Sequence, residues 1–104
     1  MITATDWRPV TKNTLRGFLT LKLAPSGLVL KDCSLHEKGD KRWIGLPSKP
    51  QLDSDGRQRK DAATGKPLYT PSVEIVGKAE RERFQEAALA AVDRLLGREF
   101  GGAA

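Results

Sequence analysis

The chain has 104 residues, which is enough for one domain with a modest core and too few for two. Apolar residues make up 38%, no stretch approaches the roughly 20 apolar residues of a membrane-spanning helix, and the single cysteine excludes an internal disulfide. The first residues also lack the basic start and apolar run of a secretion signal. We therefore expect one cytoplasmic domain with no membrane segment.

The net charge of +5 is unevenly distributed along the chain. Residues 1–77 contain 13 basic and 8 acidic side chains, whereas residues 78–104 contain five of each. A basic excess favours a polyanionic partner such as nucleic acid, and the alternative is that the charge serves only solubility.

The strongest structural pattern is a hairpin over residues 15–35. Residues 15–23 alternate with a period of two, which predicts a half-buried strand. Pro25-Ser26-Gly27 has the composition of a turn, and residues 28–35 resume extended structure. One predicted face holds Leu15, Leu19, Leu21 and Leu23, and the other holds Arg16, Phe18, Thr20 and Lys22.

Further strands are expected on both sides of the hairpin. Residues 3–10 predict a first strand anchored by its tryptophan, and residues 42–46 predict a short strand that extends the meander. Residues 50–67 have no periodicity and predict a flexible basic loop. Residues 68–76 predict a last strand, interrupted or at a sheet edge because Pro71 cannot donate to a ladder.

The carboxyl-terminal part predicts a helix over residues 78–96. Most of its residues are strong helix formers, and Gly97 stands where a helix C-cap glycine belongs. The tail at residues 101–104 is expected to be disordered. The predicted fold is therefore α+β, a small antiparallel meander followed by one carboxyl-terminal helix. The apolar stripe expected to face the sheet contains Phe84, Ala88, Ala91, Val92 and Leu95.

Several segments resemble one known family in order along the chain. Residues 28–35, a polar turn and the run Trp43-Ile44-Gly45-Leu46-Pro47-Ser48-Lys49 resemble the stage V sporulation protein G (SpoVG, septation protein) family. Thr5-Asp6-Trp7-Arg8 and residues 84–89 are similar to its opening and to its last helix. The first hairpin is shorter than in the family, residues 61–67 look like an insertion, and Leu46 replaces a methionine.

The resemblance implies a single domain over residues 1–100 that forms a homodimer, binds DNA or RNA and acts in regulation. A second resemblance is to single-stranded-DNA binders related to the transcriptional coactivator positive cofactor 4, with which only the order of strands and helix is shared.

The candidate binding surface combines cations with aromatic rings. Basic side chains neutralise phosphates and release counterions, and exposed rings can stack on unpaired bases. The alternatives are that Trp43 belongs to the core and that the loop cations are only solvated; pattern alone does not decide which face of residues 42–46 is buried. The candidate residues are Arg16, Phe18, Lys22, Lys41, Arg42, Trp43, Lys49, Arg57, Arg59 and Lys60, with Lys66 beside them in the loop.

Catalytic and metal-binding patterns are weak. His36 is the only histidine, and Cys33 lies within a predicted strand, where a small buried hydrophobe is expected. Asp53 and Asp55 before Gly56 lack the glutamate that completes a calcium loop. We therefore expect a protein that is not an enzyme, with no cofactor and no small-molecule substrate. The other function considered is a protein–protein adaptor or an accessory protein of a phage or mobile element.

Overall fold

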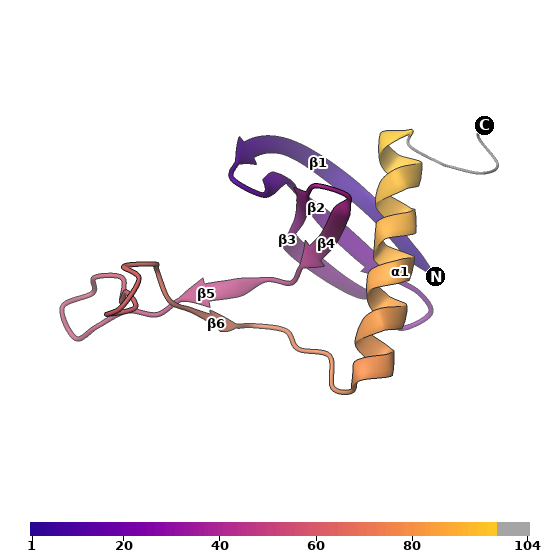
Figure 1. Cartoon of the computed structure of the whole chain (residues 1–104). Helices are drawn as coiled ribbons and strands as arrows, with labels where there is room; N and C mark the ends of the chain where they lie inside the picture. Colours follow the sequence, from indigo (N-terminus) through magenta and orange to yellow (C-terminus); the bar gives the residue numbers. More distant parts are fainter. Residues whose placement is uncertain (98–104) are drawn as a thin grey trace.

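The computed structural model describes residues 1–97, which form a four-stranded antiparallel sheet, a separate two-stranded ribbon and one helix (Figure 1). This arrangement confirms the predicted α+β fold with a carboxyl-terminal helix. The predicted disordered tail at residues 101–104 lies outside the described residues. The elements are β1 (Ile2–Lys12), β2 (Leu15–Leu23), β3 (Leu28–Lys38), β4 (Lys41–Gly45), β5 (Ser48–Pro50), β6 (Tyr69–Pro71) and α1 (Lys78–Leu96).

The main sheet is a meander in the order β1-β2-β3-β4. The predicted hairpin is confirmed, since Leu23 pairs with Leu28 across the turn, and β3 continues three residues beyond the expected end. The first strand is confirmed as well, although a register shift interrupts its pairing with β2 between Thr5 and Arg8. Asp6, in this interruption, has a φ of 58°, a left-handed conformation that Asp tolerates better than most residues.

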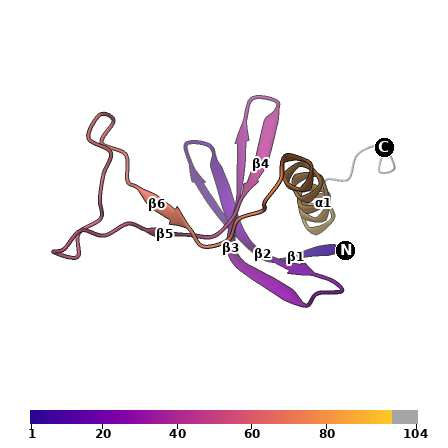
Figure 2. The same cartoon turned by 90° about the horizontal axis from the view of Figure 1, so that it is seen from below.

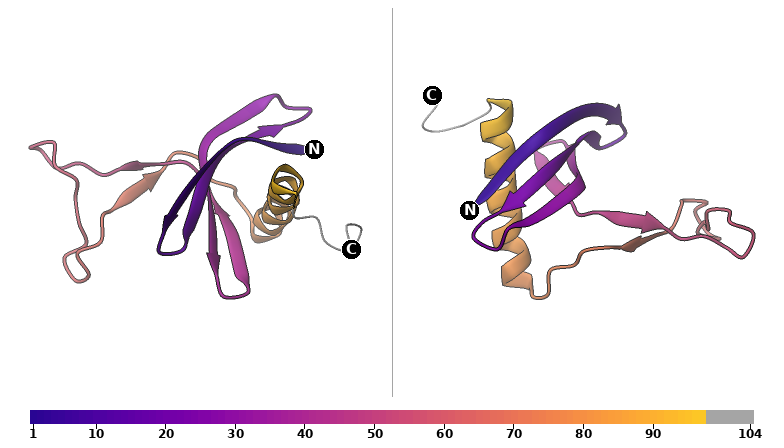
Figure 3. Two further views of the ribbon diagram at one scale, coloured as in Figure 1. Left: turned by 90° about the horizontal axis from the view of Figure 1, so that it is seen from above. Right: turned by 180° about the vertical axis from the view of Figure 1, so that it is seen from behind.

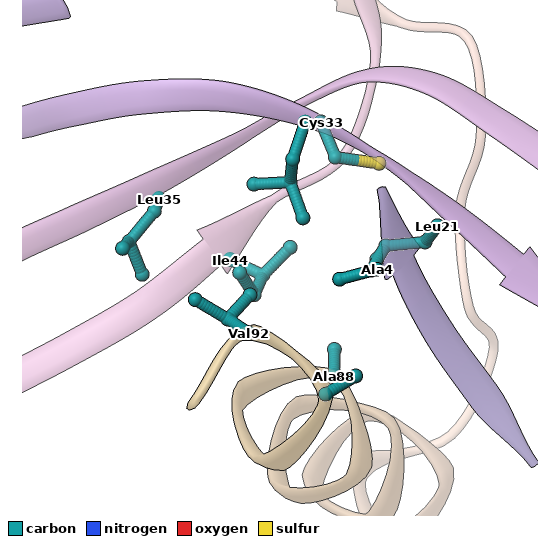
Figure 4. Close-up of a cluster of buried hydrophobic side chains, with 9 residues drawn as sticks. Ala4, Leu21, Cys33, Leu35, Ile44, Ala88 and Val92 are labelled. Carbon is teal, nitrogen blue, oxygen red and sulfur yellow. The ribbon is translucent and has the colours of Figure 1, made fainter. Parts of the chain in front are cut away.

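Helix α1 covers one face of the sheet and encloses the core (Figure 4). Alanines at helix positions 88 and 91 allow a close approach, because a small side chain leaves room for the leucines of the sheet. The sheet contributes Ala4, Leu19, Leu21, Cys33, Leu35 and Ile44, and the helix contributes Ala88, Ala91 and Val92.

The predicted helix stripe is correct except at its end. Leu95 is 38% exposed, whereas Leu96 packs against the core and Asp93 is buried. Asp93 forms an ion pair with Arg42 of β4. The last turn of the helix therefore presents a charged residue to the sheet, where the predicted stripe has only apolar ones. The C-cap prediction is confirmed, since Gly97 is left-handed and its backbone N–H bonds to the carbonyl of Asp93.

The chain after β4 departs from the sequence prediction. The strand expected over residues 68–76 is wrong in extent, because only Tyr69–Pro71 is a strand, and it pairs with β5 outside the main sheet. Prolines at both strands shorten the ladder, since proline lacks the donor that a longer pairing needs. We call residues 48–71 the arm. It carries no buried residue and extends from the side of the sheet opposite the helix (Figures 2 and 3).

The tip of the arm has defined backbone hydrogen bonds, whereas the sequence predicts an irregular loop there. The backbone N–H of Arg59 bonds to the carbonyl of Gln51 at 2.7 Å, and the N–H of Leu68 bonds to the carbonyl of Arg59 at 2.9 Å. Two tight turns flank this centre, at residues 53–57 and 61–66. The mobility expected for residues 50–67 stays a prediction.

The outer edge of β4 is closed by a helix side chain. The Gln85 carboxamide accepts a hydrogen bond from the Ile44 backbone N–H at 2.8 Å and donates one to the Ile44 carbonyl at 2.9 Å. Gln85 thereby takes the place of a neighbouring strand at this position. Within residues 1–97, no helix has the length and apolar character needed to cross a membrane.

Candidate nucleic-acid interface

The face of the main sheet that α1 leaves uncovered, which we call the open face, carries three successive cross-strand pairs of β3 and β4. Ile44 and its partner Leu35 are buried beneath the helix, so the alternating side chains of both strands project to the other side. The three pairs are Lys38 with Lys41, His36 with Trp43, and Ser34 with Gly45. The sequence pattern did not decide which face of β4 is buried, and the register with β3 does. Trp43 lies on the open face with 38% of its surface exposed.

His36 and Trp43 form a nearly parallel stack, with ring centroids 5.4 Å apart and an interplanar angle of 4°. The imidazole is fixed in this position, because Nδ1 lies 3.0 Å from the Thr14 hydroxyl and Nε2 lies 2.9 Å from the Ser34 hydroxyl. Burial lowers the pKa of His36. The two hydroxyl contacts therefore hold the imidazole as a fixed support for the indole.

Gly45 leaves the space that this arrangement requires. A Cβ at residue 45 would collide with the Ser34 hydroxyl and lie 3.4 Å from Nε2 of His36. Any larger residue would therefore displace the hydroxyl that holds the imidazole.

Phe18 lies on the open face but is covered by an arginine. It pairs with Ser34 across the β2–β3 ladder, and the guanidinium of Arg8 lies 5.8 Å from its ring centroid. Arg8 also bonds to Asp32 at 2.8 Å, so β1 is bridged to β3 across β2. Sequence reasoning missed this role of Arg8. Phe18 is thus a less accessible ring than Trp43.

Arg42 has to be removed from the candidate surface. Its guanidinium points to the helix side and bonds to both carboxylate oxygens of Asp93, at 2.5 and 2.7 Å. The hydrogen bond to Asp93 raises the pKa of Arg42 above its ordinary value. A bidentate pair of this kind joins β4 to the helix and is not available to a phosphate.

Arg16 is also committed to the fold. It donates to the backbone carbonyls of Asn13 and Leu15 at 2.8 and 3.1 Å, and its Nε lies 3.6 Å from a carboxylate oxygen of Glu37. These contacts hold the β1–β2 turn, so a phosphate would have to compete for the guanidinium.

The two predicted lysines of the main sheet lie far apart. Lys41 begins β4 beside the β3–β4 turn, whereas Lys22 pairs with Val29 near the β2–β3 turn. The seven residue-to-residue steps of β2 from Leu15 to Lys22 place the two lysines more than about 20 Å apart at the usual rise per residue. Lys41 instead faces Lys38, a cation that the sequence analysis did not select.

The arm carries the remaining predicted cations. All of them are exposed, and no carboxylate within residues 1–97 forms an ion pair with any of them. They are Lys49, Arg57, Arg59 and Lys60, together with Lys66.

Two acidic residues of the arm bind its own backbone. One carboxylate oxygen of Asp53 accepts from the N–H groups of Asp55 and Arg57, both at 2.9 Å. Asp61 accepts from Ala63 and Thr64 in the second turn, and these backbone bonds lower the pKa of Asp61. The acidic residues therefore shape the two turns that flank Arg59 and Lys60.

Other parts of the described chain offer less. A hollow of about 590 Å³ lies where the arm meets the start of the helix, and Leu46, Val73 and Phe84 are among its lining residues. Cys33 is fully buried as predicted, and desolvation followed by the charge of Asp32 raises the pKa of its thiol to about 11. Across residues 1–97, no three His, Cys, Asp or Glu side chains are grouped to hold a metal ion.

Comparisons with protein-family models, with curated proteins and with solved structures find no match for this chain.

Proposed function

We propose that this protein binds nucleic acid through the open face of its sheet and the basic arm, without catalysing a reaction. The observation that carries the proposal is the display, on an arm without a core of its own, of five cations that form no ion pair with a carboxylate of residues 1–97. An isolated two-stranded ribbon is marginal in water, so an element of this kind gains stability from a ligand that it contacts. A phosphate polymer is the ligand whose charge complements it.

The arm and the open face lie on the same side of the sheet, opposite the helix (Figures 2 and 3). A flexible polyanion could therefore contact Lys38, Lys41 and Trp43 together with the arm, which begins only three residues after β4. The helix is a poor second surface, because Arg83 and Lys78 already pair with Glu80 and Glu82.

The resemblance to the sporulation protein G family adds a regulatory role and a homodimer to the proposal. The molar mass in solution, measured by light scattering on an eluting peak, checks the dimer directly. A molar mass of one chain at the concentrations used for binding would refute the proposed homodimer and leave the proposed nucleic-acid interface unaffected.

The test of the function is binding of fluorescent DNA and RNA oligonucleotides at several salt concentrations. Replacing Arg57 and Lys60 by glutamine should weaken binding and reduce the slope of log affinity against log salt by about 1.4 for single strands. The matched control replaces Lys78 and Arg83 by glutamine, which changes the net charge equally. Equal losses of affinity in both variants would refute the arm as a binding site. Salt-insensitive binding of a protein partner, without binding of nucleic acid, would favour the adaptor hypothesis.

A further inference from the structure

We propose that Trp43 is a stacking platform for an unpaired base, so that the ligand of this surface is a single-stranded nucleic acid. The inference rests on the proposed function and names the form of nucleic acid that the open face selects.

The indole is already oriented for stacking. One ring face lies against His36 at an interplanar angle of 4°, and the two hydroxyls that contact the imidazole fix this support. A base that adds to a ring already held in place has little side-chain entropy to remove, which favours binding.

The second ring face is directed away from the sheet. β4 is the last strand in the order β1-β2-β3-β4, so no strand formed by residues 1–97 stands beside Trp43 on the side away from His36. Gln85 and the helix close the same edge on the opposite face, where they contact Ile44. A planar ligand can therefore extend the His36–Trp43 stack by one ring.

The pair of residues next to this stack favours an anionic ligand. Lys38 and Lys41 are directly opposite one another on the open face, two residues along each strand from His36 and Trp43. Like charges in this position destabilise a sheet, and a phosphate between them would relieve the repulsion. The spacing of two residues along the strand, about 7 Å, suits a nucleotide whose base lies on Trp43 and whose phosphate lies between the lysines.

The base has to be unpaired. Inside a duplex, each base is covered on both faces by its neighbours, so a fixed indole finds no free face on which to stack. Phe18 is not an equivalent platform, because Arg8 covers its ring.

The experiment compares two fluorescent strands of equal length and charge, an oligothymidylate and an abasic sugar-phosphate strand. Trp43→Ala should weaken binding of the oligothymidylate about 5- to 150-fold and leave binding of the abasic strand and the salt slope unchanged. Trp43→Phe, which retains a ring, should recover most of the loss. Wild-type tryptophan fluorescence should change with the oligothymidylate and not with the abasic strand, a measurement that stands even if Trp43→Ala fails to fold.

The failure of this inference is distinct from failure of the proposed function. Equal affinity of the wild type for both strands, or tighter binding of a duplex than of either, would overturn stacking at Trp43 while nucleic-acid binding stands. Absence of binding to every strand at low salt would overturn both.

Discussion

Replacing Arg42 by methionine is expected to destabilise the protein without weakening nucleic-acid binding. The substitution retains the apolar stem and removes the guanidinium, so Asp93, whose side chain is only 11% exposed in the folded protein, loses its partner. Removing one member of a fully buried pair costs about 3–5 kcal/mol. Because 29% of the Arg42 side chain is exposed, water can partly replace it, and we expect a loss of about 2 kcal/mol.

For a domain of this size, a loss of about 2 kcal/mol corresponds to a fall of about 8–16 °C in the midpoint of thermal unfolding. Denaturant unfolding followed by circular dichroism measures the same free energy. The double variant Arg42→Met, Asp93→Leu should recover at least half of the loss, because it no longer leaves a charge unpaired. Arg83→Met is the control, since its exposed pair with Glu80 should contribute under about 0.5 kcal/mol.

The binding measurement completes this test. At a temperature where Arg42→Met is folded, its affinity for an oligonucleotide should equal that of the wild type. If Arg42→Met is as stable as the wild type, the stabilising role of the Arg42–Asp93 ion pair is refuted. If this variant is stable and has lost affinity for the oligonucleotide, Arg42 belongs to the nucleic-acid interface after all.

Three further results are expected. Gly17→Ala should lower the unfolding midpoint, because a Cβ there would lie 2.5 Å from the Trp7 ring, and an unchanged midpoint would contradict this packing. Gln85→Leu should reduce the free energy of unfolding by about 1–3 kcal/mol, measured by denaturant titration, because it leaves the Ile44 backbone groups unpaired. Gln85→Glu should recover only part of this loss, since a carboxylate accepts from the Ile44 N–H but cannot donate to the Ile44 carbonyl. Burial raises the pKa of Cys33 to about 11, so as the pH rises the thiol loses its proton in the unfolded chain at a lower pH than in the folded protein. The stability of the wild type should therefore fall between pH 9 and 11 by more than that of Cys33→Ala.

The hairpin and the helix were predictable because each is long enough for its period to be counted. Nine residues of sequence alternation predicted β2, although two register shifts with β3 interrupt it and Thr20, expected on the polar face, is buried. The helix has the predicted bounds, and Gly97 stops it at its end. The error at Leu95 comes from Asp93, since a buried carboxylate at a helical position is recognisable only once its arginine is located on another element.

The candidate site was predictable in composition and less so in geometry. The five residues of β4 place Ile44 and Trp43 on opposite faces, so only the register with β3 decides which is buried. The arm depends on pairing between Ser48 and Pro71, which are 23 residues apart and carry no periodic pattern. The cations of the arm were identified from charge alone. That Arg42 belongs to an ion pair with the helix, and not with these cations on the candidate surface, could be seen only in the folded structure.

The contact of Gln85 with Ile44 determines how copies of this chain could join through their sheets. At Ile44, the backbone groups on the outer border of β4 are occupied by the protein's own carboxamide, so a strand from another molecule could pair there only by displacing Gln85. An assembly that uses a single free border consumes it on both molecules at once and therefore stops at two. Strand addition without end requires two usable borders, and on β4 it would have to displace Gln85 from Ile44.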